Sequence, residues 1–202
     1  KIFRSCIQRH RNVRYVFLGS KTHLMKRMFG DAARPFYNSA CPMPLEKPPE
    51  AESLEFLLSR FRDAGLELAD AEARTILSDS QNVPYHLQEL ASGVFEQVTQ
   101  GGRTSVTAAD VQCAIDEIVA RNAELYDVRI GTFSDTKYAL ACALASEPTA
   151  VFDEGYRRRH SLPVSSTIHA ALRELVETGI VDEGRARKLY RLADPFLGRY
   201  LL

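Results

Sequence analysis

The residues of this sequence that could perform chemistry begin with Gly19-Ser20-Lys21-Thr22, which follows an apolar run that ends at Leu18. Gly, Lys and Thr are the residue types of a phosphate-binding loop, where backbone N–H groups surround the phosphates, Lys reaches the outer pair and the hydroxyl holds Mg²⁺. That loop needs the spacing G-x-x-x-x-G-K-[ST]. Here Ser20 separates Gly19 from Lys21, and the 202 residues contain neither this pattern nor G-x-G-x-x-G. The stretch is therefore predicted to be the end of a buried strand and a turn, without a phosphate loop.

No other set of titratable residues has the spacing of a catalytic or metal centre. The four cysteines are scattered without a C-x-x-C motif, and the five histidines show no ligand spacing. We find no nucleophile–base pair and no paired carboxylates in a readable motif. The chain taken alone is therefore not predicted to be an enzyme, and its thiols are expected to be free in a reducing cytoplasm.

The net charge of zero conceals an uneven distribution. Residues 1–50 carry ten Lys and Arg against three Asp and Glu, residues 51–133 carry six against fourteen, and residues 134–202 carry ten against nine. Such asymmetry indicates three segments with different neighbours. The basic first segment could face phosphate, nucleic acid or the acidic middle segment. No apolar run is long enough for a membrane span, so we expect no membrane partner.

The first segment, residues 1–48, has the pattern of part of an α/β domain. A helix is expected over 2–10. A second, short helix is expected after Gly19, with Leu24, Met25, Met28 and Phe29 on one face, and it should stop at Gly30-Asp31. The run 13–18 is continuously apolar and β-branched, which is typical of a strand covered on both faces of a parallel sheet. The prolines of 40–45 allow only an edge strand there. Because this is too little to fold alone, and because the chain starts at Lys1 with a helix under way, we expect it to be a piece of a longer protein.

The middle segment, residues 49–123, is predicted to be a bundle of four short helices. The first covers 50–64 and ends at Gly65, and Asp70 is expected to cap the second. Pro84 occupies the first turn of the third. Thr107, with Asp110 three residues later, resembles a capping box that opens the fourth.

The last segment, residues 124–202, has the element order of a winged helix-turn-helix. Three helices are expected, from Ser134, over about 151–158, and from Pro163. A hairpin of two short strands follows, and Asp194-Pro195 begins a final helix. The predicted fold class is therefore mainly α: a remnant of an α/β P-loop core, a helical lid bundle and a C-terminal winged helix.

These pieces in this order resemble the C-terminal part of a STAND/AAA-type (AAA+) P-loop ATPase of the archaeal-type group. The resemblance covers nearly the whole chain and rests on four stretches: "VRYVFLGS", "RPFYNSA", "NVPYHLQELA" and "SSTIHAALRELVETGIVDE…KLYRLADPF". In that family a nucleotide-binding core is followed by a helical lid and a winged helix. Asn82 stands where the lid motif usually has Gly. The Walker A loop and the acidic Walker B strand of the family are absent from the chain.

The resemblance implies a nucleotide-driven switch. Ser20 would take the sensor position near the γ-phosphate, Arg34 would reach a phosphate in cis or across a subunit boundary, and Pro84 and Tyr85 would line the adenine pocket. ATP and Mg²⁺ would bind only with the missing P-loop half as partner. The simpler alternatives are that Ser20 caps the next helix, that Arg34 is a solvated charge, and that Pro84 and Tyr85 serve helix start and core.

The winged helix would bind DNA if its third helix entered the major groove, with wing residues on backbone phosphates. The residues concerned are Ser165, Ser166, His169, Arg173, Arg185, Arg187 and Lys188. The low net charge of this segment argues against DNA contact, because DNA-binding modules are usually strongly basic. Two alternatives to the ATPase interpretation stay open: a winged-helix DNA-binding transcriptional regulator and a protein-interaction module. An unpaired edge of the strand 13–18 would also allow a homodimer.

Overall fold

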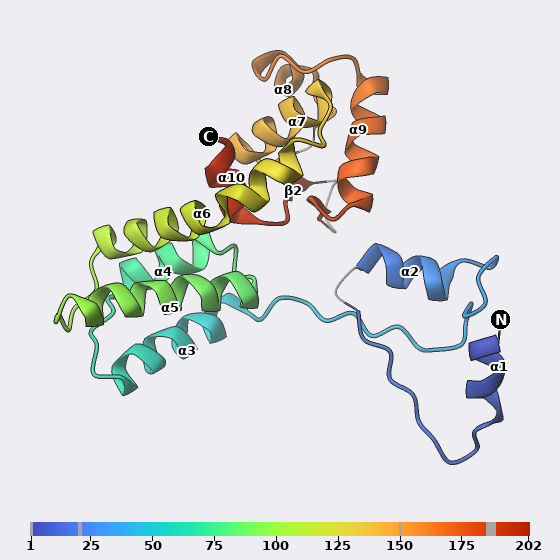
Figure 1. Ribbon diagram of the computed structural model, residues 1–202, viewed down its shortest axis with the longest axis horizontal. Coiled ribbons are helices and arrows are strands. Elements are labelled where there is room, and N and C mark those ends of the chain that lie inside the picture. Colours follow the sequence, from blue (N-terminus) through green and yellow to red (C-terminus); the bar gives the residue numbers. More distant parts are fainter. Residues whose placement is uncertain (1, 20–21, 150, 185–188) are drawn as a thin grey trace. The chain divides into compact units, whose positions relative to one another are not determined.

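The computed structural model describes residues 2–19, 22–149, 151–184 and 189–202, and the chain divides into two compact units, Lys1–Glu46 and Lys47–Leu202 (Figure 1). The described part is mainly helical, and its one sheet has two strands. The predicted mainly α class is thereby confirmed. None of the described helices is long and apolar enough to cross a membrane.

The first unit contains two short helices, α1 (Ile2–Arg9) and α2 (Thr22–Gly30), as the periodicity predicts. Three aromatic rings pack together between α2 and the segments on either side of it. The ring centroid of Phe17 lies 5.2 Å from that of Phe29 and 5.7 Å from that of Phe36. These rings are only partly buried, so the unit has a small hydrophobic cluster.

The two strands predicted in this unit are wrong. Residues 13–18 and 40–45 have no strand structure, and the side chains of Val16 and Leu18 are 81% and 84% exposed. A strand forms only when a neighbour accepts and donates its ladder hydrogen bonds. Within the described residues the sheet pairs two C-terminal strands with each other and offers no partner to this run.

The second unit begins with four helices: α3 (Glu50–Asp63), α4 (Asp70–Asp79), α5 (Pro84–Gln100) and α6 (Ala108–Ile130). Apolar residues three and four apart on α5 and α6 face each other and are almost fully buried, as expected for amphipathic helices; they include Leu90, Val94, Val98, Val111, Ile115 and Ile118. Gly65 follows α3 with φ of 76°. Asp70 is the first residue of α4, and Ala69 takes the cap position, which corrects the predicted cap.

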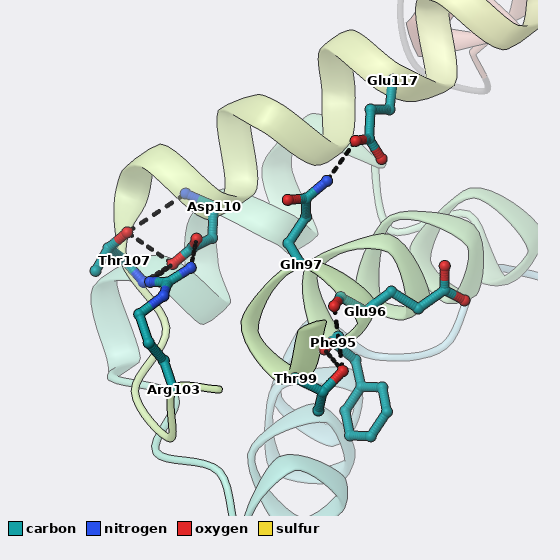
Figure 2. Close-up of polar contacts among 8 residues, drawn as sticks. All are labelled: Phe95, Glu96, Gln97, Thr99, Arg103, Thr107, Asp110 and Glu117. Carbon is teal, nitrogen blue, oxygen red and sulfur yellow. Dashed lines mark hydrogen bonds and ion pairs between the residues drawn. The ribbon is translucent and has the colours of Figure 1, made fainter. Parts of the chain in front are cut away.

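The turn between α5 and α6 is held by Asp110 (Figure 2). The Thr107 side chain accepts a hydrogen bond from the Asp110 backbone, and the Asp110 carboxylate accepts one from the Thr107 backbone at 2.8 Å, so the predicted capping box is confirmed. Arg103 forms a bidentate pair with the same carboxylate. This pair holds the pKa of Asp110 well below its usual range. On the facing sides of the two helices Gln97 donates to Glu117.

The C-terminal part contains α7 (Asp135–Ser146), α8 (Glu154–Arg159), α9 (Ser165–Glu177), β1 (Val181–Glu183), β2 (Tyr190–Leu192) and α10 (Pro195–Leu201). The strands are antiparallel, with Asp182 opposite Arg191. Side chains from α7, α9, β2 and α10 form one core. The predicted order of three helices, a hairpin and a final helix is confirmed. α6 runs without a break across residue 123, and the division into lid and winged helix at that point stays a prediction.

Candidate functional site

The turn between α4 and α5 has an unusual backbone. Gln81 and Asn82 have φ of 53° and 50°, so two successive non-glycine residues are in the left-handed region. Their N–H groups donate to the carbonyls of Ser78 and Leu77, each at 2.9 Å. This conformation costs about 1–2 kcal/mol for most residues and less for Asn. Asn82 therefore adopts the left-handed backbone conformation that Gly, the usual residue at this position of the lid motif, adopts without strain.

Residues 47 and 48 are tied to this turn by two hydrogen bonds. The Lys47 ammonium donates to the Gln81 carbonyl at 2.5 Å, and the Asn82 side-chain amide donates to the Pro48 carbonyl at 2.9 Å. Both bonds join groups 34 positions apart in the sequence. The turn is therefore fixed from outside as well as by its own hydrogen bonds.

Lys47 also lies near the β1–β2 hairpin. Its partial burial and the positive charge of Arg191 lower the pKa of Lys47 to about 8, while Asp182 acts in the opposite direction. Two cations thus stand close enough to perturb each other. An anion bound near them would relieve this repulsion, because an opposite charge favours the protonated form.

The first turn of α5 carries two aromatic side chains in different environments. Pro84 and Tyr85 are exposed, Tyr85 by 69%. The ring of His86 is largely covered and packs edge-on against Tyr85 and Phe196, with centroid distances of 5.1 and 5.5 Å. Pro84 begins the helix as predicted, but Tyr85 does not fill a core.

Two buried polar atoms at this end of α5 have no hydrogen-bond partner in the described part of the chain. They are Asn82 Oδ1 and His86 Nδ1. His86 Nδ1 lies 3.8 Å from the nearest carboxylate oxygen of Glu89, which is too long for a hydrogen bond. Buried polar atoms in native proteins are nearly always bonded to protein, water or ligand. We call the group Lys47, Asn82, Pro84, Tyr85 and His86 the α5 corner.

Helix α10 connects the α5 corner to the C-terminal elements. Arg199 on α10 pairs with Asp79 at the end of α4, at 2.7 Å. Asp194 caps α10 by accepting from the backbone of Phe196 at 2.9 Å, and its other oxygen accepts from the Tyr126 hydroxyl of α6 at 3.0 Å. Burial and the Asp194 charge raise the pKa of Tyr126, which therefore stays a neutral donor.

The predicted phosphate-contacting residues belong to the first unit. Ser20 lies outside the described residues. Arg34 is exposed, and its guanidinium lies 3.5 Å from the Asp31 carboxylate. An exposed pair of this kind contributes little to stability and leaves the guanidinium accessible.

The predicted nucleic-acid residues that the structure describes lie on α9. Ser166, His169 and Arg173 are exposed and Ser165 is half-buried. The imidazole of His169 stacks on Phe152, with ring centroids 4.0 Å apart. Arg185, Arg187 and Lys188 lie outside the described residues.

Sequence reasoning missed three members of the α5 corner and its surroundings. Lys47 is one of ten basic residues in residues 1–50 and lies in a proline-rich stretch. No local pattern connects it to Gln81. His86 and Arg191 each looked like one polar residue in an apolar pattern. The only available signal was the Asn82-Val83-Pro84 tripeptide, which marks the turn and the helix start.

Comparisons with known proteins show a likeness of fold only. No protein-family model matches the sequence, and no curated protein does so. A solved structure, a Walker-type ATPase of Pyrococcus abyssi, is similar with a TM-score of 0.61 and 17% sequence identity. The match covers 91% of this chain and 51% of that one, so the chain spans about half the length of the solved protein. The fold is thus related to that of a Walker-type ATPase.

Proposed function

We propose that this chain is the nucleotide-responsive part of an ATPase and that it receives the nucleotide base at the α5 corner. The observation that carries the proposal is the pair of unbonded buried atoms, Asn82 Oδ1 and His86 Nδ1, beside the exposed ring of Tyr85. An amide oxygen can accept from an exocyclic amine, and an aromatic face can stack on a base. The likeness to a Walker-type ATPase supports the same assignment.

The phosphates of the nucleotide need positively charged groups and hydrogen-bond donors. Lys47 and Arg191 supply positive charge next to the corner. The sequence contains no G-x-x-x-x-G-K-[ST] loop, so a P-loop half outside these 202 residues would hold the phosphates and Mg²⁺. The contacts that the family resemblance implies, of Ser20 with the γ-phosphate and of Arg34 with a phosphate in cis or across a subunit boundary, stay predictions.

Nucleotide state would act on the C-terminal elements through α10. This helix is bonded to α4 by Arg199 and to α6 by Asp194, and its Phe196 ring touches His86 at the α5 corner. A ligand that moves His86 therefore acts on a side chain of α10. Rigid-body motion of packed helices is a common form of nucleotide-driven switching.

The test is a titration of the full-length natural protein with a fluorescent ATP analogue in Mg²⁺. Tyr85→Ala should weaken binding about tenfold or more, since base stacking contributes about 1–3 kcal/mol. Phe56→Ala is the matched control, because Phe56 is an exposed aromatic on α3, which forms no part of the corner. Equal affinity of both variants and the natural protein would contradict the assignment of the base to the corner.

DNA binding by α9 is a second candidate, favoured by the distribution of charge along that helix. Its first two turns carry Ser165, Ser166 and His169 and no acid, and Arg173 follows. Glu174 and Glu177 come later, and Glu174 is paired with Lys137 of α7. A recognition helix contacts bases mainly through its N-terminal residues. The alternative for the same surface is docking of a protein partner.

Self-association through residues 13–18 is a further proposal about partners. Val16 and Leu18 expose most of their side chains to solvent. Light scattering at increasing concentration should give a rising mass for the natural sequence and a constant mass for the Val16→Asp, Leu18→Asp double variant. A constant monomeric mass for both would contradict it.

A further inference from the structure

Three consecutive arginines end α8, and two of them are already neutralised by the protein. Arg158 donates to the Glu154 carboxylate at 2.5 Å, one helical turn earlier. Arg159 donates to both carboxylate oxygens of Glu147, at 3.0 and 3.1 Å. The same Glu147 carboxylate lies 3.3 Å from His160 Nε2. Arg159 and His160 hold the pKa of Glu147 below its usual value, so this carboxylate stays ionised and bonded to these two side chains.

Arg157 differs from its two neighbours. Among the described residues no carboxylate lies within ion-pair distance of its guanidinium, and its Nε is buried without an acceptor. A guanidinium offers five N–H donors and cannot lose its proton at physiological pH. The protein thus places one permanent cation here without an anion.

Arg157 lines a surface depression of about 330 Å³ together with Glu154, Arg158, Ser161 and Leu162. The carboxylate of Glu154 is bonded to Arg158, so the Arg157 charge is uncompensated within the depression. The Ser161 hydroxyl adds a neutral donor. These groups suit a phosphate group, which accepts hydrogen bonds from guanidinium and hydroxyl alike.

We propose that Arg157 anchors a backbone phosphate of nucleic acid. The depression lies at the end of α8, and only residues 160–164 separate this helix from the start of α9 at Ser165. In a helix-turn-helix the helix before the recognition helix crosses the phosphate backbone while the recognition helix enters the groove. The inference rests on the DNA-binding candidate for α9 and adds the residue that fixes its register on the duplex. It is independent of the nucleotide proposal.

The test measures binding of the full-length protein to a random-sequence 30-base-pair duplex at several salt concentrations. Arg157→Gln should lower affinity about tenfold at 0.1 M salt and reduce the slope of log K against log salt by about one, because one phosphate contact is lost. Two controls remove the same charge. Arg159→Gln removes an arginine already paired with Glu147, and Arg62→Gln removes an exposed arginine on α3. Both should leave the slope within about 0.3 of the natural value.

A third variant and a second ligand separate the possible failures. If Arg173→Gln weakens duplex binding and Arg157→Gln does not, α9 binds DNA and the assignment of Arg157 is wrong. If the natural protein binds no duplex, the DNA candidate and the Arg157 inference both fall. Inorganic phosphate replaces the duplex in a parallel calorimetric titration. Arg157-dependent binding of phosphate without duplex binding would overturn nucleic acid as the source of the phosphate.

Discussion

The two units of the chain differ in how far they bury their apolar side chains. In Lys47–Leu202 the large aliphatic side chains of facing helices are almost fully covered, and Leu90 has no exposed surface. In Lys1–Glu46 the side chains of Val16, Leu18, Met43 and Leu45 are each more than 80% exposed. Helices satisfy their backbone internally and need only a packed face, whereas a strand needs a neighbouring strand. In the described residues, the second unit gives its helices a packed face, whereas the first unit gives the run 13–18 no neighbouring strand.

Core truncation should show the largest difference between the units. Leu90→Ala removes a fully buried side chain and should lower the free energy of unfolding by about 2–5 kcal/mol. Leu18→Ala removes an exposed side chain and should change it by less than about 0.5 kcal/mol. Urea unfolding followed by far-UV circular dichroism measures both. Similar losses for the two variants would mean that residues 13–18 are buried in solution.

Asp110 tests a polar contribution within the well-packed unit. Asp110→Ala removes the capping box and the Arg103 pair and should cost about 2–3 kcal/mol at pH 7, against less than about 0.5 kcal/mol for the exposed Asp116→Ala. Because the folded state lowers the pKa of Asp110, its contribution is complete above the unfolded pKa of about 3.9 and declines as pH falls below it. Urea midpoints between pH 2 and 7 measure this. A loss for Asp110→Ala that is equal at pH 2 and pH 7 would contradict it.

Asn82 tests whether the α5 corner depends on the left-handed backbone. Asn82→Val places a β-branched side chain at φ of 50° and should destabilise the second unit by about 1–2 kcal/mol more than Asn82→Gly, which adopts this backbone without strain. The pair of variants separates backbone strain from loss of the Pro48 hydrogen bond, because both remove the amide. If both variants lose the same stability in urea, the hydrogen bond matters and the backbone does not.

Lys47 tests the electrostatics of the α5 corner through the pH dependence of stability. Its pKa is about 8 in the folded state and about 10.4 when unfolded, so the unfolded chain binds more protons between these values. Stability should therefore rise with pH from about 8 to 10.4 through this group, and Lys47→Met should remove that rise. Unfolding midpoints of both proteins at pH 7, 8, 9 and 10 measure it. Parallel profiles for the natural protein and the variant would show that Lys47 does not titrate in this range.

The sequence was sufficient for most helices of the second unit because their signals are local. Gly65 and Pro84 mark helix ends, and Thr107 with Asp110 sets a cap within four residues. The strand at 13–18 was predicted wrongly because a strand depends on a partner elsewhere in the chain. Composition favours a strand there, but in the described residues no neighbour pairs with it.

The α5 corner could be predicted only in part for the same reason. Pro84 was identified from its helix-starting position, while the bond between Lys47 and Gln81 spans 34 residues and leaves no periodic pattern. The left-handed backbone of Asn82 is compatible with its residue type but is not required by it. In the sequence Arg157 is one of three consecutive arginines, and the pairing of its two neighbours with Glu154 and Glu147 exists only in the folded chain.

The most direct test of the central claim is hydrogen exchange of the full-length natural protein with and without ATP and Mg²⁺. The account predicts slower exchange on ATP binding over residues 80–87, which contain the corner residues Asn82, Tyr85 and His86, and a smaller change in α10 through Phe196. Tyr85→Ala should abolish the protection of 80–87 at the same ATP concentration. Nucleotide binding that protects other regions and leaves 80–87 unchanged would contradict the assignment of the base to the α5 corner.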